Sequence, residues 1–109
     1  MTELTTETFD NFISKNELAF VDFWADWCRP CLTMAPELEI FAAAKPDIAI
    51  GKVNINDGDN ATLAQKFDVR TIPNFVLFKD GTLIGSISGA QTSDSLLEKV
   101  SSLLGDEND

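Results

Sequence analysis

Histidine is absent from this 109-residue chain, and positive charge is scarce. Histidine is the commonest general base near neutral pH and the commonest zinc ligand, so histidine-based catalysis and histidine-containing zinc sites are excluded. There are 8 Lys and Arg against 18 Asp and Glu, which gives a net charge of −10. A chain this acidic repels phosphate backbones and anionic lipid surfaces. Neither nucleic acid nor a membrane is therefore an expected partner.

Long apolar runs and linkers are also lacking. No uncharged apolar stretch approaches the roughly 20 residues that span a bilayer. Residues 1–5 carry no basic region and no apolar core, which predicts no signal peptide and a cytoplasmic location. No repeat, Pro-rich stretch or Gly/Ser linker divides the chain. We therefore expect one domain over residues 1–104 and an acidic tail over residues 105–109.

Only two cysteines are present, Cys28 and Cys31, in a Cys-x-x-Cys spacing. A disulfide scaffold would need several pairs, and a bridge across so short a loop removes little chain entropy. A structural zinc site needs four ligands, whereas one chain supplies two thiols. The spacing therefore favours a redox-active disulfide, with no metal and no separate cofactor.

The hydrophobic pattern predicts an α/β fold with a mixed central sheet covered by helices on both faces. Residues 18–24 form a near-continuous apolar run, which is typical of a central strand that is buried on both faces. Further strands are expected at residues 48–55, 75–78 and 82–87, the last two joined at Asp80-Gly81. Helices are expected at residues 6–14, 31–44 and 60–67 and over the stripe from Leu96 to Leu104, with Thr92 or Ser95 as N-cap. Pro36 should kink the second of these helices.

The cysteine pair lies where the apolar strand ends and a helix begins, a position where sites gather in open α/β sheets. Cys28 should cap the helix and Cys31 should lie one turn in. A helix N-terminus favours a thiolate, so we expect Cys28 to be the more exposed and more acidic thiol. Pro30 falls in the first turn, where its missing N–H costs nothing, and it should stiffen the ring formed on oxidation.

Several motifs, in order along residues 3–104, resemble the thioredoxin family. They are residues 21–31 (VDFWADWCRPC), 52–55 (KVNI), 71–73 (TIP), the turn at 78–81 and Gly89-Ala90. The resemblance implies the thioredoxin fold and dithiol–disulfide exchange with protein substrates. It also implies a monomer that donates electrons to client proteins and is recharged by a thioredoxin reductase.

Two residues depart from the family pattern. Arg29 stands where the family usually has Gly, and Leu32 stands where it often has Lys. Arg29 is either a tolerated exposed residue or a residue that stabilises the thiolate and alters partner choice. A positive charge at this place would tune the redox chemistry of the pair.

Asp22 is the only charge in the apolar strand. Burial of a carboxyl is expensive and raises its pKa toward neutrality, which suits a proton acceptor. The resemblance places Asp22 beneath Cys31, with Lys52 nearby on the next strand. The alternative is an Asp22–Lys52 pair with a purely structural role. Asp26 is interpreted as a surface charge.

The resemblance also implies a client-binding surface. In the family a cis-proline loop faces the disulfide, so the Ile72–Pro73 bond is expected to be cis and the Thr71–Ile72 backbone to bind an extended client segment. The expected apolar platform consists of Trp27, Ile72, Pro73, Gly89 and Ala90. Trp27 should be partly exposed, whereas Trp24 is expected in the core.

The expected reaction is disulfide reduction: Cys28 attacks a client disulfide, and Cys31, deprotonated by Asp22, resolves the mixed disulfide. An oxidase or isomerase on the same fold is an alternative, which the missing export signal and the lack of His between the cysteines disfavour. A non-catalytic binding module would work without either cysteine. A metal-bridged dimer would share four thiolates and contain zinc.

Overall fold

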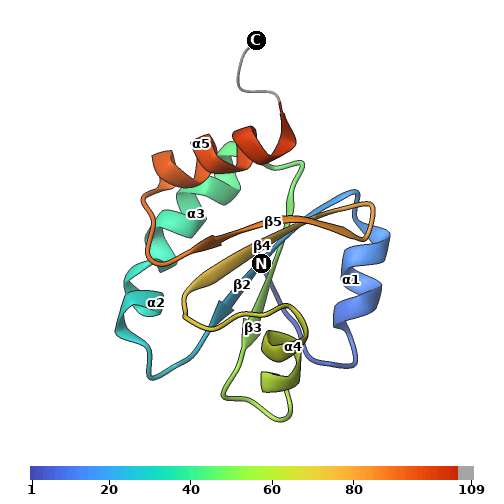
Figure 1. Ribbon diagram of the computed structural model, residues 1–109. Helices are drawn as coiled ribbons and strands as arrows, with labels where there is room; N and C mark the ends of the chain where they lie inside the picture. The colour runs from blue at the N-terminus through green and yellow to red at the C-terminus, as the bar shows by residue number, and fades with distance from the viewer. Residues whose placement is uncertain (106–109) are drawn as a thin grey trace.

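The strands form one five-stranded mixed sheet in the order β1-β3-β2-β4-β5 (Figure 1). The computed structural model describes residues 1–105. The strands are β1 (Thr2–Glu3), β2 (Leu18–Trp24), β3 (Ala49–Asn54), β4 (Asn74–Lys79) and β5 (Thr82–Ser88). β1, β3 and β2 are parallel, whereas β4 is antiparallel to both β2 and β5. The predicted mixed α/β sheet is confirmed, and β2 lies at its centre.

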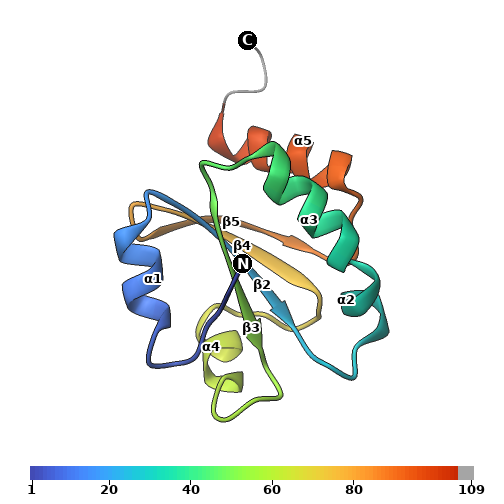
Figure 2. The same cartoon turned by 180° about the vertical axis from the view of Figure 1, so that it is seen from behind.

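Helices cover both faces of this sheet (Figures 1 and 2). They are α1 (Phe9–Lys15), α2 (Arg29–Thr33), α3 (Ala35–Ala44), α4 (Ala61–Lys66) and α5 (Ser93–Leu104). α1 and α4 pack on one face around Phe9, and α3 and α5 pack on the other around Phe41 and Leu96. The helical stripes read from the sequence are therefore core faces, as apolar residues at helical spacing predict.

Strand β2 begins and ends at the predicted residues because both of its faces are covered. Its side chains alternate between the two faces, so Val21 packs with α1 and α4 while Phe20 packs with α3 and α5. By the same alternation, Asp22 lies on the face that carries Phe20. β3 and β4 flank this position with Lys52 and Phe75. A charged side chain is thus held in the middle of a hydrophobic sheet.

Local turn and cap signals were read correctly in two places. Asp80 and Gly81 join β4 to β5 with positive φ angles of 52° and 80°, as the hairpin prediction requires. The N-cap of α5 is Thr92 rather than Ser95, because the Thr92 hydroxyl accepts the Ser95 N–H at 3.1 Å. α5 ends at Leu104, and residues 106–109 of the predicted acidic tail lie outside the described residues.

The predicted helix over residues 31–44 differs from the structure. It is interrupted at Met34, which ends α2 and begins α3, so the expected kink at Pro36 was placed too far along the chain. Pro36 has no N–H for the Leu32 carbonyl and its ring crowds that carbonyl, so the break falls on the turn before the proline. Pro36 itself lies in the first turn of α3, where proline is tolerated. No helix within residues 1–105 is both long and apolar enough to cross a membrane.

Candidate active site

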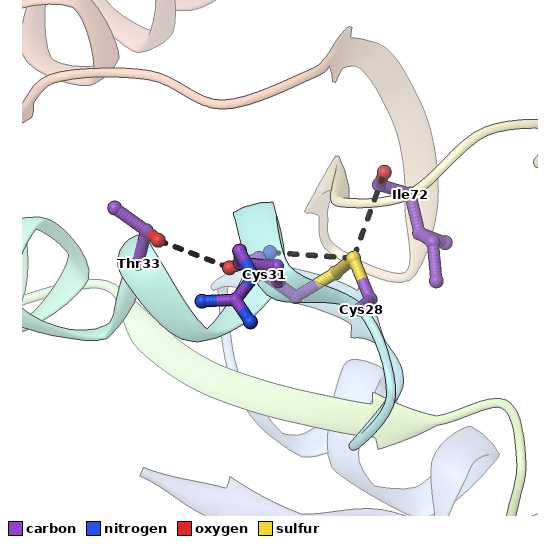
Figure 3. Close-up of a disulfide and its surroundings, with 5 residues drawn as sticks. Cys28, Cys31, Thr33 and Ile72 are labelled. Atoms are coloured by element: carbon purple, nitrogen blue, oxygen red, sulfur yellow. Dashed lines mark hydrogen bonds between the residues drawn. A yellow bond between two sulfur atoms is a disulfide. The ribbon is translucent and has the colours of Figure 1, made fainter.

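Cys28 and Cys31 form a disulfide at the start of α2, directly after β2 and its connecting loop (Figure 3). Their Cα atoms are 5.3 Å apart. Cys28 is the N-cap residue, Cys31 lies one turn in, and Pro30 occupies the first turn, as predicted. The close spacing follows from helix geometry, which brings residues three positions apart onto one face.

The two sulfur atoms have different surroundings. The Cys31 N–H donates to Cys28 Sγ at 3.3 Å, and Cys28 Sγ also lies 3.9 Å from the Ile72 carbonyl oxygen (Figure 3). A backbone N–H that donates to sulfur favours the thiolate form, and in this structure such a contact is made to Cys28 Sγ. In the disulfide form Cys28 and Cys31 are equally buried, at 5% and 6% exposed, so the exposure predicted for the reduced Cys28 thiol stays a prediction. The loop that carries Ile72 covers Cys28.

Asp22 is only 3% exposed. Burial raises the pKa of Asp22 to about 7, with Lys52 lowering it and Glu3 raising it to lesser extents. Lys52 is the register partner of both Asp22 on β2 and Glu3 on β1, so the three charges follow one row across the sheet. Among the described residues, Asp22 Oδ1 has no hydrogen-bond partner. A carboxyl in this state exchanges a proton near neutral pH.

Trp24 connects the cysteines to this charged row. It was predicted to lie in the core, but the structure shows it half-buried. Its ring packs against the Cys28 and Cys31 cluster, and Lys52 Nζ lies 4.6 Å from the ring centroid. This cation–π contact explains why the ring stays near the surface, since a lysine ammonium keeps access to water.

The loop opposite the disulfide contains the predicted cis bond between Ile72 and Pro73. The Gly89 N–H donates to the Pro73 carbonyl at 2.8 Å, which joins this loop to the end of β5. Pro73 is buried, so it adds less surface to the predicted apolar platform than expected. The remaining platform residues reach the surface: Trp27 and Ala90 are exposed, and Ile72 and Gly89 are half-buried. Thr71 is exposed beside them.

The departures from the family pattern both lie on the surface. Arg29 is exposed, and Leu32 is 53% exposed, a large fraction for a leucine. Asp26 is a surface charge, as predicted. Sequence reasoning missed the effect of Glu3 on Asp22, because nothing in a two-residue edge strand signals that Glu3 is the register partner of Lys52. Within residues 1–105 no three Cys, Asp or Glu side chains gather as a metal site.

A disulfide that caps a short helix at the end of a central strand, beside a cis-proline loop, defines a protein-disulfide oxidoreductase. The profile of the family described as Thioredoxin matches residues 1–102. Thioredoxin of Chlamydia pneumoniae is 40% identical over 93 residues, which cover 85% of this chain and 88% of that protein. Thioredoxin of Mycolicibacterium smegmatis is 37% identical over 103 residues, or 93% of this chain and 92% of that protein.

Solved structures agree with the sequence relatives. The crystal structure of oxidized mitochondrial thioredoxin 3 from Saccharomyces cerevisiae superimposes with a TM-score of 0.84 at 36% identity, covering 94% of each chain. The chain belongs to the thioredoxin family. It carries out dithiol–disulfide exchange through the Cys28–Cys31 pair.

Proposed function

We propose that the chain works in the reducing direction, with Cys28 as nucleophile and Cys31 as resolving thiol. The observation that carries this assignment is the Cys31 N–H that donates to Cys28 Sγ at 3.3 Å. The Cys28 thiolate attacks one sulfur of a client disulfide, a Cys28–client bond forms, and the other client sulfur leaves as a thiolate. The Cys31 thiolate then attacks Cys28 Sγ, forms the intramolecular disulfide and releases the second client thiolate. Two electrons pass from the dithiol to the client.

Asp22 is proposed to accept the proton from Cys31 before the second attack. A carboxyl with a pKa of about 7 holds and releases a proton at the pH where the reaction takes place. Contacts support this role, because Trp24 packs against the cysteine cluster and lies under Lys52, the register partner of Asp22. Lys52 then tunes Asp22, and Pro30 and Arg29 tune the cysteine pair.

The surface around the disulfide is proposed to bind an extended client segment. The Thr71–Ile72 backbone supplies hydrogen-bonding groups, and Trp27, Ile72, Gly89 and Ala90 supply apolar contact. The oxidised protein is then recharged by a thioredoxin reductase, and the chain acts as a monomer in the cytoplasm.

Two measurements test the direction of the reaction. Reduced protein should reduce insulin disulfides, and a variant with Cys28→Ser and Cys31→Ser should not, whereas a binding module would keep its partner without either thiol. Equilibration with glutathione poised at about −220 mV should leave this protein mostly as its disulfide, because a reductant passes electrons to the oxidised glutathione. A protein that stays mostly dithiol in this buffer is an oxidant, and the proposal is then wrong.

A further inference from the structure

Beside the disulfide, α2 borders a surface hollow of about 450 Å³. The hollow is lined by Asp26, Trp27, Arg29, Leu32 and Thr33, and we call it the α2 hollow. Trp27 and Leu32 are 65% and 53% exposed and form its apolar lining. Both residues that depart from the family pattern, Arg29 and Leu32, therefore face one depression next to Cys28.

Arg29 is the cation of the α2 hollow. Among residues 1–105 the only ion pair joins Arg70 to Asp68, so the Arg29 guanidinium has no acidic partner there. Thr33 Oγ1 donates to the Arg29 carbonyl oxygen at 3.0 Å, which fixes the backbone and leaves the guanidinium free. The one acid in the lining, Asp26, accepts a hydrogen bond from Asn56 Nδ2 at 3.4 Å.

A second hollow near the end of α2 has a different character. It shares Thr33 with the α2 hollow and is otherwise lined by Met34, Glu37, Ala90, Gln91 and Thr92, with no cation. Glu37 Oε1 in this lining already accepts the Ser93 N–H at 2.6 Å. Of these two hollows, only the α2 hollow contains a cation, which is Arg29. This matters in a chain with a net charge of −10, which repels acidic segments elsewhere.

We propose that the α2 hollow is a specificity site for client segments that carry a carboxylate and an aliphatic side chain beside the reactive cysteine. The carboxylate pairs with Arg29, and the aliphatic side chain packs on Trp27 and Leu32. This inference rests on the proposed reductase function, because it concerns which disulfides Cys28 attacks. Guanidinium–carboxylate pairing offers two parallel hydrogen bonds, and the apolar lining adds contact area.

The test is a double-mutant cycle on reduction rates. Disulfide-linked peptides carry either Glu or Gln on both sides of the cysteine, with Leu beyond, and are reduced by the wild-type protein and by Arg29→Gln. We expect the Glu-to-Gln rate ratio to be about two- to fivefold higher for the wild type, and this gap to shrink in high salt. Lys79→Gln removes the same charge from the opposite end of the sheet, where Lys79 pairs with Leu18 at the start of β2, and should leave the ratio unchanged.

A second arm tests the apolar lining. Leu32→Gln should lower the rate on a Leu-bearing peptide relative to an Ala-bearing one by about two- to fivefold. Ile40→Gln is the matched control, since Ile40 on α3 is also 53% exposed but does not line the hollow. An unchanged Glu-to-Gln ratio in Arg29→Gln, or an equal fall in Lys79→Gln, overturns the specificity site. A wild-type protein that reduces none of the peptides instead overturns the proposed reductase function.

Discussion

Strand β2 and helix α2 meet at the cysteine pair, and each holds one charge close to it in sequence. Asp22 is 3% exposed within β2, and burial raises its pKa to about 7. Arg29 is exposed on α2, where water screens its charge. Arg29 is adjacent to Cys28 in the sequence and Asp22 lies six residues before it, yet the larger effect is expected from Asp22, because burial rather than proximity in sequence sets the size of an electrostatic effect. The buried charge suits proton transfer, and the exposed one suits selection among clients.

The largest effect is expected at the junction between the two regions. Cys31→Ser should abolish turnover and accumulate a mixed disulfide between Cys28 and the client, because the resolving thiol is gone. Cys28→Ser should abolish turnover without an adduct. Mass spectrometry of the non-reduced protein after incubation with a client disulfide distinguishes the two. Adducts on Cys31 in the Cys28→Ser variant, at wild-type rate, would reverse the assigned roles.

Asp22→Asn should give the next largest effect, on stability. The folded-state pKa of Asp22 is about 7 and the ordinary value is 3.8, so the folded state holds the proton more tightly. The free energy of unfolding therefore falls progressively as pH rises from about 4 to about 7, because charging the buried carboxyl destabilises the folded state. Asn imitates the protonated form, so the gain should be near zero at pH 4 and up to about 4 kcal/mol at pH 8.

Urea unfolding at both pH values measures this gain, and Asp26→Asn is the matched control. Asp26→Asn is the same chemical change at an exposed position four residues further on, so it should alter the free energy of unfolding by no more than about 0.5 kcal/mol. A gain for Asp22→Asn that is equal at pH 4 and pH 8 would mean that burial does not shift the titration of this carboxyl.

Lys52→Met should sharpen the contrast between buried Asp22 and exposed Arg29 further. Lys52 is the charge that lowers the pKa of Asp22, so its removal should move that pKa above about 7. Each unit of further rise costs about 1.4 kcal/mol of stability above the new pKa. Carbon-13 NMR of the Asp22 carboxyl follows the titration. Lys66→Met removes another lysine that lies over an aromatic ring, Phe67, and should not move it.

The smallest effect is expected from the exposed charge. Arg29→Gly should lower the redox potential by at most about 15–30 mV, because the positive charge stabilises the Cys28 thiolate and hence the reduced form. Leu32→Lys should raise the potential slightly, and both shifts should shrink in high salt. Glutathione titrations at two ionic strengths measure them. A rise for Arg29→Gly would show that Arg29 acts through the loop rather than through its charge.

The sequence predicted those parts of the site that depend on local pattern. The apolar run of β2, the hairpin turn at Asp80-Gly81 and the capping position of Cys28 all follow from neighbouring residues, and the structure confirms each. The burial of Asp22 was also predictable, because a single charge within a central strand has no route to water.

Features that depend on contacts between distant segments were not predictable in the same way. The equal burial of Cys28 and Cys31 depends on the Ile72 loop, and the half-buried position of Trp24 depends on Lys52 from another strand. The involvement of Glu3 depends on strand register. The helix break at Met34 is a different case. The sequence contains Pro36, but the effect of this proline falls on the preceding turn.

The rate at which Cys31 resolves a mixed disulfide tests the role of Asp22 most directly. A chromogenic aromatic disulfide gives two phases in stopped flow: a concentration-dependent attack by Cys28 and a unimolecular resolution by Cys31. In the wild type, resolution should speed up as pH rises through about 7, where Asp22 loses its proton. In Asp22→Asn it should be about 100-fold slower near pH 7, with the attack phase little changed. Equal resolution rates and equal pH profiles in the two proteins would contradict the role of Asp22 as proton acceptor.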